Sequence, residues 1–258
     1  MAPLVFITGA SSGIGQALAW RYYQAGFNLA LVARRTEEIA LWARTRHLSV
    51  DRFQIYGADV AQLDSIIAAA QLCLRQQGVP EVVIASAGIS IGMDSSIRAD
   101  LDVMAQTFAV NNVGLAATFH AFIDPMIQRG SGRLVGISSV AGIRGLPGHG
   151  AYCASKAGVI SYCESLRGEL RSTGVGVVTI GPGYIDTPLT QKNRYRMPFL
   201  MPPEKFADRA FRAIQANVSY RVIPWQMGWL AKILRMLPNA VLDRLLAGRP
   251  RKRRSDGT

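Results

Sequence analysis

Tyr152 and Lys156 are the pair of residues in this sequence best suited to proton transfer. They stand four positions apart in the helical stretch AYCASKAG, so their side chains are expected on one helix face. A tyrosine in isolation titrates at about 10. A neighbouring ammonium favours the phenolate, and we therefore expect Lys156 to lower the pKa of Tyr152. Such a pair suits interconversion of an alcohol and a carbonyl, although the same spacing also occurs on ordinary amphipathic helices.

A glycine-rich segment near the N-terminus is suited to binding phosphate. TGASSGIG, residues 8–15, places Gly9, Gly13 and Gly15 between an apolar run and a helical stretch. Glycines let backbone N–H groups approach a pyrophosphate, and a helix N-terminus favours negative charge. The spacing differs from G-x-G-x-x-G, and a purely structural turn would need no ligand. The strand before the segment and the helix after it favour a dinucleotide site.

Two arginines follow the next apolar run and bear on the choice of dinucleotide. A carboxylate at this position accepts hydrogen bonds from the ribose hydroxyls of NAD, but here the run ends in Ala33, Arg34 and Arg35. A guanidinium can bind a 2′-phosphate through two charge-assisted hydrogen bonds. Paired arginines also occur at solvated helix starts. Together with the glycine segment, they favour NADP(H).

The elements that must position these residues alternate along the chain. Runs rich in Val, Ile and Leu predict strands at 4–8, 28–33, 53–58, 81–86, 133–138, 175–181 and 220–224. Helical composition predicts helices at 14–25, 36–47, 63–76, 111–128, 151–171 and 204–216. This order predicts an α/β fold: one Rossmann-type, doubly wound parallel sheet of about seven strands in three α/β/α layers. Ligands then bind at the carboxyl edge of the sheet, where each motif falls.

Five motifs together resemble the short-chain dehydrogenase/reductase family. They are TGASSGIG, VNNVG at 110–114, ISS ending thirteen residues before Tyr152, the Tyr-x-x-x-Lys pair, and GPGYIDT at 181–187. By this resemblance Tyr152 is the general acid/base, and Lys156 binds the nicotinamide ribose and lowers the pKa of Tyr152. Ser139 rather than Ser138 positions the substrate oxygen. Asn111, with Asn112 as the less favoured choice, sits at a helix kink that holds a water for proton relay.

The resemblance also implies a set of cofactor-binding residues along the sheet edge. They are Gly9, Ser11, Ser12, Gly13, Ile14, Gly15, Arg34, Arg35, Asp59, Val60, Ala87, Gly88, Tyr152, Lys156, Pro182, Gly183, Ile185 and Thr187. In one departure, the fourth strand ends in Ser86-Ala87-Gly88, where the family commonly has an asparagine in place of Ser86. The serine hydroxyl can make only part of the hydrogen bonds of that amide.

Cysteine and histidine usage indicates neither disulfides nor metal. The three cysteines form no CxxC pair and are interpreted as small buried residues, and the histidines have no ligand spacing. His149 and Cys153, near Tyr152, are expected to pack locally or line the pocket wall. The N-terminus lacks the pattern of a secretory signal, so we predict a cytoplasmic protein.

The C-terminal third carries the substrate and partner predictions. Residues 188–202 fall where the family has its variable, substrate-covering segment, and their apolar middle suits a lid over an apolar or acyl-like substrate as well as simple packing. Residues 225–246 show helical amphipathicity around Pro238. They either pack on the domain or a second copy, or lie on anionic lipid through 225–254. We predict one domain over 1–224, with 225–258 belonging to it.

The net charge of +12 is concentrated at the C-terminus. From Trp225 onward there are eight basic and two acidic residues, half of the net charge. Such tails are typically solvated, so we predict no nucleic-acid partner. The family resemblance implies a homo-dimer or homo-tetramer acting on a small carbonyl or alcohol. The alternative function is a catalytically silent nucleotide-binding scaffold that docks on a membrane through its tail.

Overall fold

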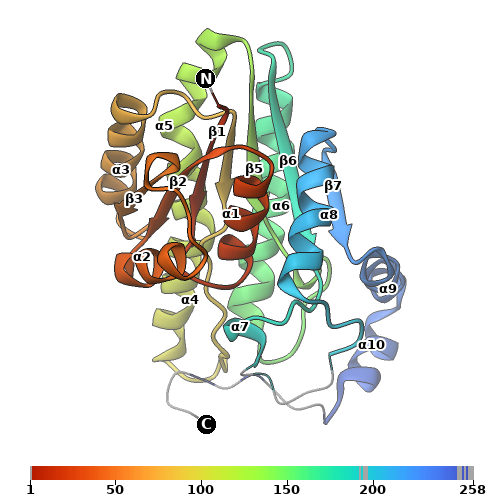
Figure 1. Cartoon of the computed structure of the whole chain (residues 1–258). Coiled ribbons are helices and arrows are strands. Elements are labelled where there is room, and N and C mark those ends of the chain that lie inside the picture. Colours follow the sequence, from red (N-terminus) through yellow and green to blue (C-terminus); the bar gives the residue numbers. More distant parts are fainter. Residues whose placement is uncertain (1, 192, 194–196, 249–251, 253, 255–258) are drawn as a thin grey trace.

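The computed structural model describes residues 2–191, 193, 197–248, 252 and 254. Its strands form one parallel sheet of seven in the order β3-β2-β1-β4-β5-β6-β7 (Figure 1). The strands are β1 (Leu4–Thr8), β2 (Asn28–Ala33), β3 (Phe53–Gly57), β4 (Val82–Ala85), β5 (Gly132–Ile137), β6 (Val175–Pro182) and β7 (Tyr220–Ile223). The predicted fold class and number of strands are confirmed.

Helices cover both faces of this sheet (Figure 1). One apolar core lies between the sheet and α1 (Gly13–Gln24), α2 (Thr36–Thr45) and α8 (Pro203–Gln215). A second core lies between the opposite face and α3 (Leu63–Gln76), α5 (Gly114–Arg129) and α6 (Gly150–Glu169). β1 shows why its sequence is continuously apolar: Val5 and Ile7 enter the first core, while Leu4 and Phe6 enter the second.

The chain first adds strands on one side of β1 and then on the other side. This change of direction creates the crevice that holds the site. The chain moves from β1 through β2 to β3, then crosses back to place β4 on the other side of β1. Loops that follow β1 and β4 therefore diverge at the carboxyl edge. The hydroxyl of Thr8 fixes these two loops relative to each other, because it accepts hydrogen bonds from the backbone N–H groups of Ser86 (3.1 Å) and Ala87 (3.2 Å).

The helix predicted at 111–128 belongs to a longer helical run. Helix α4 (Asp100–Phe108) leads through a π-helical turn (Ala109–Val113) into α5 without a break. The predicted helix therefore starts too late and leaves out α4. The sequence before residue 111 has no clear apolar run, so it gave no sign of this helix. Asp100 and Asp102 lie in the first turn of α4, where carboxylates complement the helix dipole.

Two further helices follow the last strand at one end of the sheet. They are α9 (Trp225–Met236) and α10 (Asn239–Leu246), and Pro238 precedes α10 as the sequence predicted. The short helix α7 (Pro188–Gln191) begins the predicted lid, of which residues 192 and 194–196 lie outside the described residues. Of the basic tail, only Lys252 and Arg254 are described. Within the described ranges, no helix is long and apolar enough to cross a bilayer.

Candidate active site

Helix α6 presents Tyr152 and Lys156 at the carboxyl edge of β5. Lys156 is buried, and its Nζ donates a 2.9 Å hydrogen bond to the carbonyl of Ile137, the last residue of β5. The same Nζ lies 5.8 Å from the ring centroid of Tyr152. The loop after β5 packs tightly on this helix, since a methyl group on Gly142 would come within 2.7 Å of the Lys156 carbonyl. The helix therefore holds both side chains at the sheet edge.

Ser138 and Ser139 directly follow β5, and their hydroxyls have different hydrogen-bond partners. The Ser138 hydroxyl donates to the carbonyl of Lys156 at 2.7 Å, so it fastens α6 to the strand. The Ser139 hydroxyl accepts from the N–H of Ala141 at 3.1 Å, and Ser139 lines the same cavity as Tyr152. The Ser138 hydroxyl is thus engaged by the backbone of α6, and the role of Ser139 in positioning the substrate oxygen stays a prediction.

Burial controls the titration of the pair. It raises the pKa of the Tyr152 phenol, and the hydrogen bond from Ser139 offsets part of that rise. Burial also lowers the pKa of Lys156 to about 8. The expectation that Lys156 lowers the pKa of Tyr152 is therefore not met in this structure. The physical reason is that removing a phenolate from water outweighs the other interactions of the phenol.

The π-helical turn places Asn111 behind the catalytic pair. Its amide is engaged on three sides: Oδ1 accepts from the N–H of Ile89 (2.9 Å), and Nδ2 donates to the Ile89 carbonyl (3.0 Å) and to the Ser155 hydroxyl (2.9 Å). Ser155 in turn donates to the carbonyl of Tyr152 at 2.9 Å. Asn112 donates to the Ser155 carbonyl instead. A chain of hydrogen bonds thus connects the loop after β4 with the first turn of α6.

A cavity of about 500 Å³ runs along the carboxyl edge of the sheet and contains the predicted cofactor residues. Its walls come from the loops after β1, β2, β3, β4 and β6. All eighteen positions of the predicted set line it: Gly9, Ser11, Ser12, Gly13, Ile14, Gly15, Arg34, Arg35, Asp59, Val60, Ala87, Gly88, Tyr152, Lys156, Pro182, Gly183, Ile185 and Thr187. The structure therefore brings the whole set together.

The start of α1 fits the phosphates of a dinucleotide. Its N-cap, Ser12, makes no side-chain capping bond, and no acidic residue lies in the first turn. Gly9 (φ 70°) and Gly13 (φ 56°) adopt left-handed backbone conformations that favour glycine. A methyl group on Gly15 would lie 2.3 Å from the carbonyl oxygen of Gly9. These features leave backbone donors facing the cavity, as an anion requires.

The paired arginines flank the outer part of this cavity. Arg34 lies 3.6 Å from Asp59, and Arg35 donates to the Ser11 hydroxyl (3.4 Å) and pairs with Glu38 (3.0 Å). Both guanidinium side chains are more than half exposed. The ion pairs are therefore weak, and either side chain can turn toward an anion at little cost.

A second cavity, of about 760 Å³, shares a wall with the first. Ser139, Tyr152 and Gly183 line both. The remainder is mostly apolar and comes from the loop after β5, from described residues of the segment after β6 and from α9 and α10: Leu146, Pro147, Tyr184, Leu189, Pro198, Met227, Leu230, Ala231, Leu234, Leu245 and Leu246. His149 also lines it. The catalytic tyrosine candidate stands where the two cavities meet.

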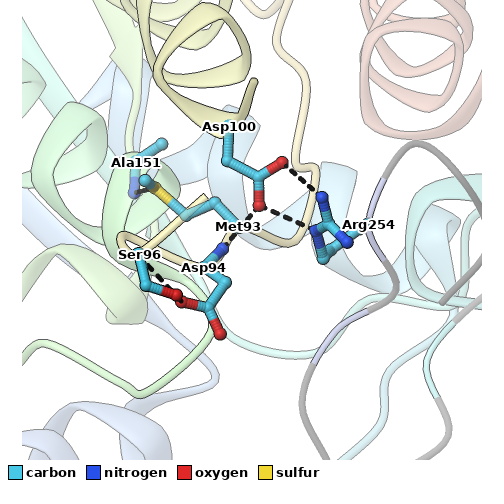
Figure 2. Close-up of polar contacts among 6 residues, drawn as sticks. All are labelled: Met93, Asp94, Ser96, Asp100, Ala151 and Arg254. Carbon is cyan, nitrogen blue, oxygen red and sulfur yellow. Dashed lines mark hydrogen bonds and ion pairs between the residues drawn. The ribbon is translucent and has the colours of Figure 1, made fainter. Parts of the chain in front are cut away.

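Two residues near the C-terminus, Lys252 and Arg254, lie at the carboxyl edge of the sheet, near the two cavities. Lys252 lines both cavities, and Arg254 places its guanidinium on both carboxylate oxygens of Asp100 (Figure 2). Asp100 also accepts a 2.6 Å hydrogen bond from the N–H of Asp94 in the loop after β4. In the same loop, Met93 accepts a hydrogen bond from the N–H of Ala151, next to Tyr152 (Figure 2). The tail, this loop and α6 are thus tied together.

The family model of the short chain dehydrogenases matches residues 3–197. The chain belongs to the short-chain dehydrogenases. A relative described as an uncharacterized oxidoreductase of Myxococcus xanthus is 33% identical over 240 residues, which cover 92% of this chain and 93% of that protein.

Solved short-chain dehydrogenases share the fold. One from Sphingobium yanoikuyae, in complex with NADPH, is 27% identical with a TM-score of 0.76, covering 92% of this chain and 97% of that one. Another from Burkholderia phymatum, in complex with NAD, is 22% identical with a TM-score of 0.81 and covers 98% of each chain. The second likeness concerns the fold alone.

Sequence reasoning missed several residues of this short-chain dehydrogenase site. Ser155, Ile89 and the Ile137 carbonyl complete the hydrogen bonds of Asn111 and Lys156, but backbone partners leave no signal in a sequence. Lys252 was counted only as part of a basic tail. The three cysteines are free and buried, as predicted. Among the described residues, no cluster of His, Cys, Asp and Glu side chains could hold a metal ion.

Proposed function

We propose that this short-chain dehydrogenase interconverts a ketone and a secondary alcohol with NADP(H), using Tyr152 as the general acid/base. The observation that carries the proposal is the position of Tyr152 and Ser139 in the wall shared by the two cavities. A substrate in the apolar chamber reaches both hydroxyls, while the other chamber has the dimensions and glycine-lined edge for a dinucleotide. A bound nicotinamide supplies or accepts the hydride.

Each side chain around Tyr152 has a separate role in the proposed proton transfer. In the reducing direction, the Tyr152 hydroxyl gives its proton to the oxygen of the carbonyl as the carbon receives hydride. Ser139, which lines both cavities beside Tyr152, positions that oxygen. Lys156, whose Nζ lies 5.8 Å from the ring centroid of Tyr152, binds the nicotinamide ribose next to the phenol. Asn111 supports α6 from behind through Ser155 and stands at the π-helical turn for proton relay.

The preference for NADP(H) over NAD(H) rests on Arg34 and Arg35. Both side chains line the cavity beyond the second strand and carry exposed guanidinium groups. A 2′-phosphate there would receive charge-assisted hydrogen bonds. Asp59 is the nearby carboxylate, and its ion pair with Arg34 compensates its charge. The NADPH complex of the relative from Sphingobium yanoikuyae is consistent with this choice.

The substrate class follows from the second cavity. Apart from His149, Arg144 and Lys252, its lining is dominated by leucine, proline and methionine, which suits an apolar or acyl-like ketone. We propose that residues 188–202 cover this chamber as a lid and that 225–258 belong to the same domain. Assembly into a homo-dimer or homo-tetramer remains a prediction that sedimentation of the purified protein tests.

The decisive experiment is the Tyr152→Phe variant. It removes the hydroxyl that carries the proton and leaves the ring that packs in the cavity wall. We expect ketone-dependent oxidation of NADPH, measured by absorbance, to fall by at least about 100-fold, the range of general acid catalysis. NADPH affinity, measured by fluorescence titration, should stay within about twofold, because the phenol makes only part of the cofactor site. Retained turnover in the variant would refute the proposal.

Tyr162→Phe is the matched control. This tyrosine is on the same helix, partly buried, and lines neither cavity. Its turnover should equal that of the wild type. A comparable loss in both variants would indicate damage to α6 rather than loss of an acid.

A further inference from the structure

Helix α9 exposes one apolar face to solvent. Trp225, Trp229, Ile233 and Met236 recur at helical spacing, and their exposed fractions are 61%, 62%, 55% and 82%. The opposite face of the helix is different: Met227, Gly228 and Ala231 are buried. Large apolar side chains that are this exposed in one contiguous stripe are unusual on a protein that stays in water.

Exposed apolar side chains also occur on α10, and basic residues accompany them on both helices. Val241 is 44% exposed and Leu245 is 48% exposed. Lys232 and Arg235 on α9 and Arg244 on α10 lie among these apolar residues, and Asp243 is the one acidic residue between 225 and 248. We call this set of apolar and basic side chains the hairpin face. Its composition differs from an apolar interface between copies of a chain, whose centre is depleted of charged residues.

The hairpin face adjoins the opening of the apolar cavity. Leu245 of the hairpin face lines the 760 Å³ chamber and is 48% exposed, and Leu230, elsewhere on α9, also lines it and is 37% exposed. Leu234 and Leu246 line the chamber beside them. An apolar molecule moving from the outer surface of α9 and α10 into the chamber would therefore stay in contact with leucines.

We propose that the hairpin face docks on an anionic lipid surface, and that the chamber takes its apolar substrate from that surface. Two tryptophans and interspersed cations are the composition of helices that lie in the interface plane of a bilayer. Each basic residue near an anionic surface adds about 1 kcal/mol of attraction, and Lys232, Arg235 and Arg244 supply that charge here. The docking stands on the hairpin face alone; the uptake of substrate rests on the proposed function.

The test uses the full-length protein and two kinds of vesicle, phosphatidylcholine alone and phosphatidylcholine mixed with phosphatidylserine. The wild type should co-sediment with the anionic vesicles and much less with the neutral ones. Raising the salt concentration should weaken binding, since exposed charges are then screened. Equal binding to both kinds of vesicle, or none to either, would overturn the proposal.

Two variants separate the apolar and the charged contributions. Trp229→Glu with Ile233→Glu places carboxylates in the stripe, and Lys232→Glu with Arg235→Glu reverses two charges. Each pair should reduce the vesicle partition coefficient more than about tenfold. Leu41→Glu on α2 is the control, because Leu41 is equally exposed (61%) on a different surface. It should bind as the wild type does, and a matching loss there would count against the hairpin face.

Turnover provides the second readout and keeps the two proposals apart. None of the four altered positions lines either cavity. Reduction of a water-soluble ketone should therefore stay unchanged in both variants, whereas reduction of a long-chain ketone presented in anionic vesicles should fall. If sedimentation instead shows that the wild type is dimeric and the Trp229→Glu, Ile233→Glu variant monomeric, the hairpin face is a subunit interface and lipid docking is refuted.

Discussion

Arg254 and Asp100, 154 residues apart in the chain, form a two-pronged ion pair at the carboxyl edge of the sheet. The Arg254 Nε lies 2.8 Å from Oδ2 of Asp100, and the second nitrogen lies 2.9 Å from Oδ1. Asp100 is almost fully buried, at 2% exposed. A buried carboxylate needs such a partner, because an uncompensated charge inside a protein is strongly unfavourable.

Arg254→Ala should therefore destabilise the protein in a pH-dependent way. The Arg254 guanidinium, with the N–H of Asp94, lowers the pKa of the Asp100 carboxyl. A lowered folded-state pKa stabilises the fold at neutral pH, and that contribution is lost as the pH falls through the folded-state value. The difference in melting temperature between wild type and variant should be largest near neutrality and shrink in acid, as followed by circular dichroism.

Arg98→Ala is the control for this prediction. Arg98 pairs with Asp102 on the same helix at 3.3 Å, but both side chains are more than three-quarters exposed. An exposed pair of this kind contributes roughly 0–1 kcal/mol. If Arg254→Ala lowers the melting temperature at neutral pH no more than Arg98→Ala does, the contact between Arg254 and Asp100 contributes nothing to stability.

Lys156→Met should raise the stability of the protein at neutral pH while abolishing its activity. Burial lowers the pKa of Lys156 to about 8, so the folded state disfavours its charge. The shift corresponds to roughly 3 kcal/mol of destabilisation below pH 8, which disappears as the pH rises toward the unfolded value of about 10. Loss of the hydrogen bond to Ile137 offsets about 1 kcal/mol of the gain.

Chemical denaturation at several pH values measures this effect. The gain of the Lys156→Met variant over the wild type should be greatest near pH 7 and decline between pH 8 and pH 10. Lys205→Met, on the exposed side of α8, should show a difference that does not vary with pH. A Lys156→Met variant less stable than the wild type at every pH would contradict the assignment of a burial cost to this lysine.

Gly15→Ala should weaken both the fold and cofactor binding. The added methyl group would approach the Gly9 carbonyl oxygen to 2.3 Å, so the glycine-rich turn must shift away from α1. Overpacking of this kind costs about 1–3 kcal/mol. We expect a lower melting temperature and a raised Kd for NADPH, measured by fluorescence.

Gly168→Ala is the control, because it adds the same methyl group at a glycine that has room for it. Gly168 lies in α6, and a methyl group there would meet no atom within 4 Å. The substitution should stabilise the helix by about 0.5–1 kcal/mol and leave NADPH binding as it is. Similar effects at both glycines would argue against a close contact between Gly15 and the Gly9 turn.

Arg35→Ala should change the choice of cofactor. The loss of one charge-assisted contact to a 2′-phosphate should lower the ratio of kcat/KM with NADPH to that with NADH by roughly 10-fold to 100-fold. Arg44→Ala, near the end of α2 and exposed, should leave the ratio unchanged. Equal kcat/KM with both cofactors in the wild type would reject the preference for NADP(H) at the outset.

Local sequence was sufficient to predict the centre of the sheet because its inner strands are buried on both faces. Five consecutive buried residues in β1, from Leu4 to Thr8, leave a continuous apolar run that no surface strand would have. The glycine-rich turn and the Tyr152–Lys156 pair could also be predicted, because each depends on residues within eight positions of one another.

Features that depend on distant partners were not predictable. The polar start of α4 is held by Asp100, whose charge is compensated by a residue near the C-terminus. Ser155 became part of the site only because the π-helical turn brings Asn111 beside it. The raised pKa of Tyr152 depends on its burial, which spacing along a helix does not report.

The apolar chamber has consequences for how this protein can change over generations. Its outer wall comes from α9 and α10, which add no strand to the sheet, whereas Tyr152, Lys156 and Ser139 are anchored to β5 and α6. Substitutions at Leu230, Leu234 or Leu246 reshape the chamber without touching the groups that handle the proton. Substitutions in the last two helices can therefore change which molecules the chamber admits while Tyr152, Lys156 and Ser139 keep their positions.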